Sequence, residues 1–242
     1  MVSVRFDIKR LRTIISNVWL LKYSTGENYL VDTGHTAELP AILLSLKVYG
    51  VKGKGDLRGI LLTHRHSDHA ANAGYFAQKF KVPVYCHRND LPFLRGEKKP
   101  PQIPYGIGRF YDDILITFEN KRPAVCREAR PFEDFDNPDF IIYDAFGHTE
   151  GSVMIYHRPS KTLFSGDVLF TGIPAIGRKE RLFAAVEQYS NDVKMCHRYL
   201  VEFLSHPPLI ARICSGHGPL VEKDVMIKLK KFKESLKDRV LP

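Results

Sequence analysis

Long apolar runs are absent from this chain of 242 residues. A helix needs about 18 or more consecutive apolar residues to span a bilayer, and the best candidate, residues 14–21, is interrupted by Ser16 and Asn17. The N-terminus also has no apolar segment of the length found in signal peptides, because charged residues recur from Arg5 to Arg10. We therefore expect a cytoplasmic protein with no membrane partner.

Cysteine is also scarce, and linkers, low-complexity tracts and short repeats are absent. The four cysteines form no CxxC pair, and they are Cys86, Cys126, Cys196 and Cys214. An even number permits two disulfides, but dispersed cysteines of a cytoplasmic chain are usually small residues of the core. Apolar residues make up 44% of the chain and charged residues 26%, as in a globular protein. The sequence therefore predicts free thiols and one domain over residues 1–242.

Negative charge is in deficit, since 36 Lys and Arg residues outnumber 27 Asp and Glu residues and give a net charge of +9. Much of this excess lies in residues 223–239. Apolar residues recur there every three or four positions from Val225 to Val240, which predicts an amphipathic C-terminal helix over about 222–240. A solvated lysine face is a commoner cause of such a pattern than nucleic-acid binding. We therefore expect no nucleic-acid partner.

Strand-like and helix-like segments alternate along the chain. Short β-branched or apolar runs predict strands, and apolar residues three or four apart predict helices. The expected strands cover residues 13–22, 28–31, 59–63, 82–86, 140–143, 152–156, 162–164 and 210–214. The expected helices cover residues 42–49, 68–80 and 182–203. This alternation predicts an α/β fold in which helices cover the sheets.

Residues 92–118 form a long segment for which no helix or strand is expected. Pro92, Pro100, Pro101 and Pro104 oppose regular structure, whereas the aromatic residues of the segment are large and partly apolar. A long irregular segment within a compact domain is often a binding loop or a lid. An ordinary surface insertion has the same pattern, so both interpretations stay open.

Three histidines lie within six residues, directly after the expected strand that ends at Thr63. In an extended loop, residues two apart point to the same side, so His64 and His66 can reach one metal ion. Where the chain turns into a helix, Asp68 and His69 point in another direction and can serve a second ion. Imidazole and carboxylate donors held at the end of a strand are typical of a metal site.

Three further turns each place a candidate ligand among small residues after an expected strand. These ligands are His148, Asp167 and His217. Neighbouring glycines let the backbone turn sharply and let a metal ion or substrate approach closely. Each turn alone is a weak signal, but their order and spacing together are strong.

Five motifs together resemble the metallo-β-lactamase superfamily, and within it the glyoxalase II-like hydrolases. The motifs are Val31-Asp32-Thr33-Gly34, Thr63-His64-x-His66-x-Asp68-His69, Gly147-His148-Thr149-x-Gly151-Ser152, Ser165-Gly166-Asp167 and Ser215-Gly216-His217-Gly218-Pro219. The resemblance extends over about residues 14–220. It implies an αββα sandwich, in which two mixed sheets face each other, helices flank them and metal ions lie at one edge.

The resemblance also assigns the metal ligands by position. It implies that one ion is held by His64, His66 and His148, that the other is held by Asp68, His69 and His217, and that Asp167 bridges both. Two zinc ions are expected, with iron or manganese as alternatives. Asp32 matches a residue that the family uses behind the metal ligands, and an aspartate at this position can orient a ligand histidine.

This ligand set predicts a dinuclear hydrolase whose small-molecule substrate is a carbonyl ester, a thioester or a lactone. Zinc lowers the pKa of bound water to about 7, which supplies a metal-bound hydroxide at neutral pH, and it polarises a carbonyl oxygen. Asp68 is the carboxylate within the histidine cluster, and it can orient the hydroxide and pass a proton to the leaving group. The alternative role of Asp68 is to cap the following helix.

Other activities stay open. A mononuclear iron persulfide dioxygenase has similar histidine motifs and would use His64, His148 and Asp167 as a facial triad. A nucleic-acid or phosphodiester hydrolase comes third, because relatives that process RNA carry further elements that this sequence does not show. Full glyoxalase II enzymes append a helical domain that binds glutathione. The residues after Pro219 suffice for one helix, so we do not expect hydrolysis of glutathione thioesters.

Overall fold

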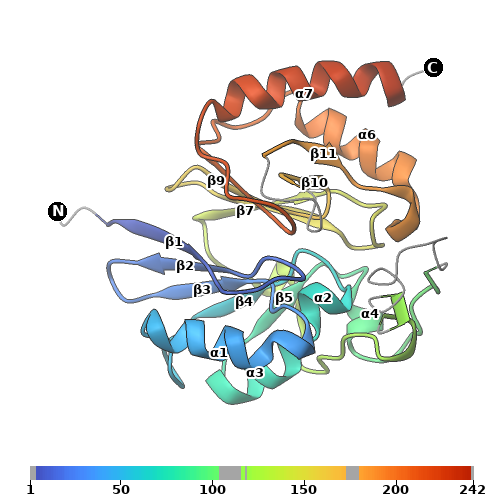
Figure 1. The fold of residues 1–242 in the computed structure, drawn as a ribbon. Helices are drawn as coiled ribbons and strands as arrows, with labels where there is room; N and C mark the ends of the chain where they lie inside the picture. Colours follow the sequence, from blue (N-terminus) through green and yellow to red (C-terminus); the bar gives the residue numbers. More distant parts are fainter. Residues whose placement is uncertain (1–3, 104–115, 118, 173–179, 241–242) are drawn as a thin grey trace. The chain divides into compact units, whose positions relative to one another are not determined.

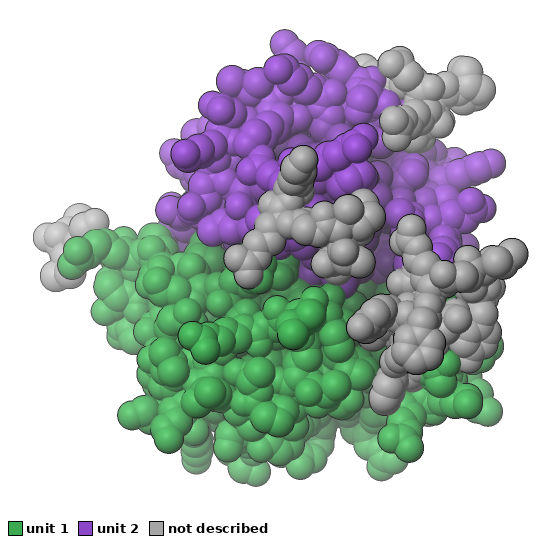
Figure 2. All heavy atoms as spheres, in the orientation of Figure 1, with its two compact units in different colours: residues 1–135 green, residues 136–242 purple. Residues whose placement is uncertain are grey.

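The computed structural model describes residues 4–103, 116–117, 119–172 and 180–240, with the side chains of residues 237–240 left out (Figure 1). By its internal contacts the chain divides into two compact units, residues 1–135 and residues 136–242 (Figure 2). We refer to them as unit 1 and unit 2. The single domain expected over residues 1–242 stays a prediction.

Unit 1 contains a six-stranded mixed sheet with the strand order β1-β2-β3-β4-β5-β6. The strands are β1 (Phe6–Arg10), β2 (Trp19–Tyr23), β3 (Asn28–Val31), β4 (Gly59–Leu61), β5 (Val84–Cys86) and β6 (Arg130–Pro131). β1 to β3 pair antiparallel, whereas β3 to β6 pair parallel. Parallel strands end at the same edge of a sheet, where α/β proteins place their sites. The segments after β3, β4 and β5 therefore start at one edge.

Two helices, α1 (Leu39–Val48) and α3 (Ala73–Phe80), cover one face of this sheet (Figure 1). Ile42 of α1 and Phe76 of α3 belong to the same buried cluster as Leu30 and Ile60 of the strands. The shorter helices of unit 1 are η1 (Thr36–Glu38), α2 (Ser67–Ala70), α4 (Leu91–Leu94) and η2 (Phe132–Asp134). Apolar residues on one side of each long helix thus form the core of unit 1.

The helix expected over residues 68–80 is interrupted, and this part of the prediction is wrong. α2 ends at Ala70, and α3 begins at Ala73. At the interruption, the buried amide of Asn72 donates to the carbonyl oxygens of Thr33, Gly34 and His35 over 2.9, 3.0 and 3.1 Å. This amide joins the break in the helix to the turn that follows β3, an interaction that helical spacing cannot reveal.

Unit 2 contains a four-stranded mixed sheet of order β12-β9-β8-β7 and a two-stranded sheet, β10-β11. The strands are β7 (Phe140–Asp144), β8 (Val153–His157), β9 (Thr162–Gly166), β10 (Leu169–Phe170), β11 (Phe183–Ala184) and β12 (Arg212–Ser215). β7, β8 and β9 are antiparallel neighbours, and β12 pairs parallel with β9. Asp167 follows β9, and His217 follows β12, so both come from the same edge of the sheet.

The helix expected from residue 182 starts later than the spacing predicts. Residues 183–184 belong to β11, η3 (Glu187–Tyr189) follows, and α6 (Val193–Phe203) begins where the side chain of Asp192 accepts a hydrogen bond from the backbone nitrogen of Met195. This N-cap accounts for the later start. The C-terminal helix α7 (Val225–Val240) is close to its predicted range. Leu200 of α6 and Leu229 of α7 share a buried cluster with Ile213 of the sheet.

Both units therefore combine mixed sheets with packed helices, which confirms the predicted α/β class. All four cysteines are buried and free, as expected. Among the described helices, none is long and apolar enough to cross a membrane.

The segment predicted to be irregular, residues 92–118, is described in part. It begins within α4, where Pro92 occupies the first turn, a position that proline tolerates. At its far end, the side chain of Asn120 accepts a hydrogen bond from the backbone nitrogen of Ile103 and donates to the carbonyl oxygen of Ile103. Residues 104–115 and 118 lie outside the described residues, so the lid stays a prediction.

Candidate metal centre

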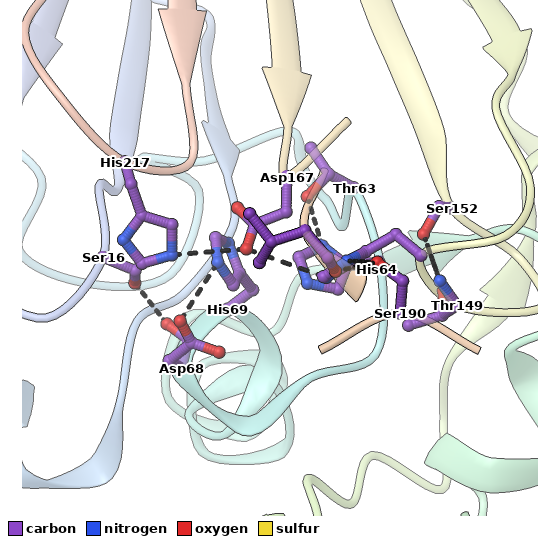
Figure 3. Close-up of polar contacts among 12 residues, drawn as sticks. Ser16, Thr63, His64, Asp68, His69, Thr149, Ser152, Asp167, Ser190 and His217 are labelled. Carbon is purple, nitrogen blue, oxygen red and sulfur yellow. Dashed lines mark hydrogen bonds and ion pairs between the residues drawn. The ribbon is translucent and has the colours of Figure 1, made fainter. Parts of the chain in front are cut away.

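The donors of unit 1 lie in the loop that follows β4. His64 and His66 are buried, and their candidate ligand nitrogens lie within 4.8 Å of one another. The two rings meet edge to face, with centroids 4.9 Å apart. Asp68 and His69 are on α2 and point toward one another (Figure 3), with Oδ2 of Asp68 3.3 Å from Nε2 of His69. All four candidate ligands of unit 1 therefore gather at the edge where β4 ends.

Asp32 lies behind these histidines, directly after β3. Its backbone has a φ of +61°, a left-handed conformation that is uncommon outside glycine, and its side chain is buried. Oδ2 of Asp32 accepts a hydrogen bond from Nδ1 of His69 over 2.9 Å. Because a carboxylate only accepts, this bond protonates Nδ1 of His69 and makes Nε2 the nitrogen that can coordinate a metal ion.

Thr63 extends the influence of Asp32 to a second histidine. The hydroxyl of Thr63 is 2.9 Å from Oδ2 of Asp32 and donates its proton to the carboxylate. The same hydroxyl oxygen is 3.0 Å from Nδ1 of His64 and can only accept there, so His64 also carries its proton on Nδ1 (Figure 3). One buried carboxylate thus sets the tautomer of two candidate ligands, His69 directly and His64 through Thr63.

Unit 2 supplies three donors. Oδ2 of Asp167 lies 3.7 Å from Nε2 of His148. The same oxygen lies 3.3 Å from Nε2 of His217 (Figure 3). Ser190 donates its hydroxyl proton to the carbonyl oxygen of Val186, so its oxygen accepts from Nδ1 of His148 over 3.2 Å. His148 therefore presents Nε2 as its coordinating nitrogen, as His64 and His69 do.

Small residues bring the backbone close together around His148. Gly147 has a φ of +118°, and a Cβ atom there would lie 2.5 Å from the backbone nitrogen of Cys196 and closer still to the carbonyl oxygen of Asp192. The start of α6 therefore packs directly on the turn that carries His148. Gly218 plays the same part beside His217, because its φ is +102° and a Cβ atom would collide with the backbone at Gly172. Glycine is required at both positions.

The donor chemistry and spacing fit metal ions. Donor atoms about 2.1 Å from one tetrahedral ion lie about 3.4 Å apart. The separations that involve Asp68 and Asp167, from 3.3 to 3.7 Å, are close to this value. Imidazole and carboxylate donors suit zinc, iron and manganese, and none of the four cysteines, all of which are described, belongs to a candidate ligand group.

The structure also reveals contacts that the motifs do not. Thr63, which is within a motif, and Ser190, which is not, orient ligand histidines. Asp90 and Glu119 accept hydrogen bonds from the backbone nitrogens of Arg65 and Ser67, on either side of His66. Asp90 follows β5 at the same sheet edge, and this position in the sequence indicates that Asp90 lies near the site. Glu119 has no such signal, because it lies more than fifty residues along the chain from its partner Ser67.

The predicted role of Asp68 as a helix cap does not match the structure. The N-cap of α2 is His66, and Asp68 is in the first helical turn. The hydroxyl of Ser16 donates to the backbone carbonyl of Asp68, which fixes its main chain, while 20% of its side chain is exposed. The side chain of His69 beside it is fully buried. Asp68 is therefore a carboxylate that solvent can reach next to a buried imidazole.

Comparisons with known proteins agree with these motifs. The family model of the metallo-beta-lactamase superfamily matches residues 11–206. The probable metallo-hydrolase YybB of Bacillus subtilis is 26% identical over 207 residues, which are 84% of this chain and 80% of YybB. The hydroxyacylglutathione hydrolase GloC of Haemophilus influenzae is 29% identical over 126 residues, 52% of this chain and 55% of GloC.

A solved structure shows the same fold. The crystal structure of TTHA1623, in a di-iron-bound form, superposes with a TM-score of 0.61 at 24% identity and covers 98% of each chain. This likeness confirms the predicted metallo-β-lactamase-like fold.

Proposed function

From the premise that the chain belongs to the metallo-beta-lactamase superfamily and is a metal-dependent hydrolase, we propose a dinuclear enzyme that cleaves a carbonyl ester, a thioester or a lactone. Following the resemblance of the five motifs, the proposed ligands are His64, His66 and His148 for one ion, Asp68, His69 and His217 for the other, and Asp167 as the bridge.

One observation carries the dinuclear proposal. A single carboxylate oxygen of Asp167 lies within 3.7 Å of coordinating nitrogens on both His148 and His217. These histidines belong to different ions in the proposed set, so a carboxylate between them is placed to bridge. A mononuclear site would need only one of these two histidines beside Asp167.

In the proposed reaction, the residues of the chain would hold the metal ions, orient their ligands and transfer a proton. Bound zinc would activate water near neutral pH and polarise the substrate carbonyl. The carboxylate of Asp68, which is partly exposed beside His69, can accept a proton and deliver it to the leaving group. Asp32 and Thr63 hold the imidazoles of His69 and His64 in the tautomer that coordination needs.

Zinc is the metal that we propose, with iron or manganese as alternatives. Imidazole and carboxylate ligands without thiolate bind all three, and the di-iron form of TTHA1623 is a case of iron in this fold. The substrate is proposed to be a small molecule. Nucleic acid is not proposed as a substrate, because a solvated lysine face is a commoner cause of the basic residues of α7 than nucleic-acid binding.

Elemental analysis of the purified protein, followed by a panel of ester, thioester and lactone substrates, tests this proposal. We expect close to two metal ions per chain and turnover of at least one of the three substrate classes that stops when a chelator removes the metal. One tightly held iron without a second ion, together with oxygen consumption on a persulfide, would instead support the dioxygenase.

A further inference from the structure

A buried arginine lies between the first two histidines of the motif. The side chain of Arg65 is 4% exposed, and two buried carboxylates, Asp90 and Glu119, are its partners. A buried charge is expensive unless it is paired and hydrogen-bonded. The three residues therefore form a buried charge cluster that includes the loop residue between His64 and His66.

The two carboxylates also bind the backbone of that loop. Oδ2 of Asp90 accepts a hydrogen bond from the backbone nitrogen of Arg65 over 2.9 Å, and Oε2 of Glu119 accepts from the backbone nitrogen of Ser67 over 2.6 Å. The first amide belongs to the peptide group between His64 and Arg65, and the second belongs to the peptide group between His66 and Ser67. The main chain of His66 is therefore held at both flanks by buried acceptors.

The guanidinium of Arg65 connects the two acceptors. Nη1 lies 3.4 Å from Oε1 of Glu119, and Nε lies 3.9 Å from Oδ1 of Asp90. The ring of Phe93 stacks against the guanidinium, with its centroid 4.8 Å from Cζ. Asp90 and Glu119 thus each use one carboxylate oxygen for a backbone amide and the other for the guanidinium of Arg65. We therefore expect the loss of Asp90, Arg65 or Glu119 to disturb the contacts of both amides, those of Arg65 and Ser67.

We propose that Asp90, Arg65 and Glu119 act as positioning residues, which we call the loop clamp, and that the clamp holds His64 and His66 in the geometry needed for metal binding. This inference rests on the proposed function. Stability alone does not require such a cluster, because buried ion pairs are often replaced by apolar residues without loss of stability. The contacts instead hold the peptide group that follows His64 and the peptide group that follows His66.

The clamp predicts a selective effect on metal binding. Residues behind metal ligands typically change metal affinity by about 10- to 100-fold when they are removed. The ion that we assign to His64, His66 and His148 should be weakened more than the ion assigned to Asp68, His69 and His217, because Arg65 and Ser67 both adjoin His66 and only Ser67 adjoins Asp68. A purely structural role would lower thermal stability without distinguishing the two ions.

Glu119→Ala is the most direct test, with Glu119→Gln as its conservative partner and Glu133→Ala as the control. Glu133 is an exposed glutamate of the same unit that pairs with Arg88. Two quantities are measured: zinc affinity, by competition with a chromophoric chelator, and amide hydrogen exchange at residues 65 and 67 in metal-free protein. Thermal unfolding of each variant verifies that it is folded.

For Glu119→Ala we expect exchange at residue 67 to accelerate at least about tenfold and one zinc ion to bind about 10- to 100-fold more weakly. Glu119→Gln keeps an acceptor for the Ser67 amide but loses the charge that faces Arg65, so it should fold and weaken the same ion less than Glu119→Ala does. Glu133→Ala should change neither quantity.

Unchanged zinc affinity in folded Glu119→Ala would overturn the clamp while leaving the proposed hydrolase intact. If Glu119→Ala does not fold, unchanged affinity and exchange in Glu119→Gln would overturn it equally. Wild-type protein that binds no zinc, iron or manganese would overturn the proposed function, and the clamp with it.

Discussion

Oδ2 of Asp32 accepts a hydrogen bond from Nδ1 of His69 over 2.9 Å, and the same carboxylate accepts the hydroxyl proton of Thr63. Through Thr63 it also determines the tautomer of His64. A single buried side chain therefore prepares one histidine of each proposed ligand set. This arrangement leads to the first prediction.

Asp32→Asn should weaken both metal ions. An asparagine amide can turn its NH2 group toward Nδ1 of His69, and it then favours the tautomer that carries its proton on Nε2. A carboxylate has no proton to donate, so it cannot favour this tautomer. We expect metal affinity to fall about 10- to 100-fold, measured by chelator competition, with a changed imidazole nitrogen pattern in the NMR spectrum. Asp7→Asn, at an exposed residue paired with Lys9, is the control and should leave both unchanged. Native affinity in Asp32→Asn would contradict the tautomer argument.

Asp68→Asn should impair turnover far more than substrate binding. The substitution keeps the size of the side chain but removes its charge and basicity, and general acid–base contributions are typically about 10²- to 10⁴-fold. We expect kcat to fall within this range while KM changes little. Metal content is measured on the same preparation. Near-normal turnover with full metal content would show that Asp68 takes no part in proton transfer.

Gly147→Ala should displace His148 and lower the stability of unit 2. The new Cβ atom would overlap the backbone at Asp192 and Cys196, in addition to the strain at a φ of +118°. We expect a loss of at least about 1–3 kcal/mol in the free energy of unfolding, measured in urea, with reduced metal content. Gly26→Ala separates the two causes, because Gly26 has a φ of +91° and nothing within 4 Å of a Cβ atom. Equal losses in the two variants would exclude the collision as the cause.

Protonation of His157 should destabilise the protein in mild acid. Burial lowers the pKa of His157 from 6.5 to about 4, while Ser160 bonds its Nδ1. The imidazole of His157 binds a proton more readily in the unfolded chain than in the folded protein. The stability that the neutral imidazole contributes is therefore fully present above pH 6.5 and is lost as the pH falls through about 4. The full effect is at most about 3 kcal/mol. Urea unfolding of His157→Gln should show a shallower loss of stability over this range, and His206→Gln, at an exposed histidine, should follow the wild type.

Much of the architecture follows from local sequence patterns. The strands β3, β4 and β9 are short runs rich in apolar residues. Polar residues of the candidate site follow each of them, so both the strand ends and the candidate site could be predicted. The sequence does not predict β1, because Asp7, Lys9 and Arg10 make it resemble a solvated segment. Pairing with β2 stabilises this strand. Edge strands often have such charged sequences.

The missed features depend on contacts between distant residues. The break at Asn72 arises from carbonyl groups almost forty residues earlier in the chain, and the clamp joins Arg65 to Glu119 across more than fifty residues. No pattern of apolar spacing contains this information. Asp90 is an intermediate case, because its place after β5 puts it at the site edge, but its partner cannot be read from the sequence.

The central claim, a dinuclear centre with seven protein ligands, is tested most directly by a crystal structure of the zinc-loaded protein with anomalous data collected at the zinc absorption edge. The account predicts two anomalous peaks about 3.5–4 Å apart. One should be bound by His64, His66 and His148, the other by Asp68, His69 and His217, with Asp167 in contact with both. A single peak, or two peaks that do not share Asp167, would contradict it.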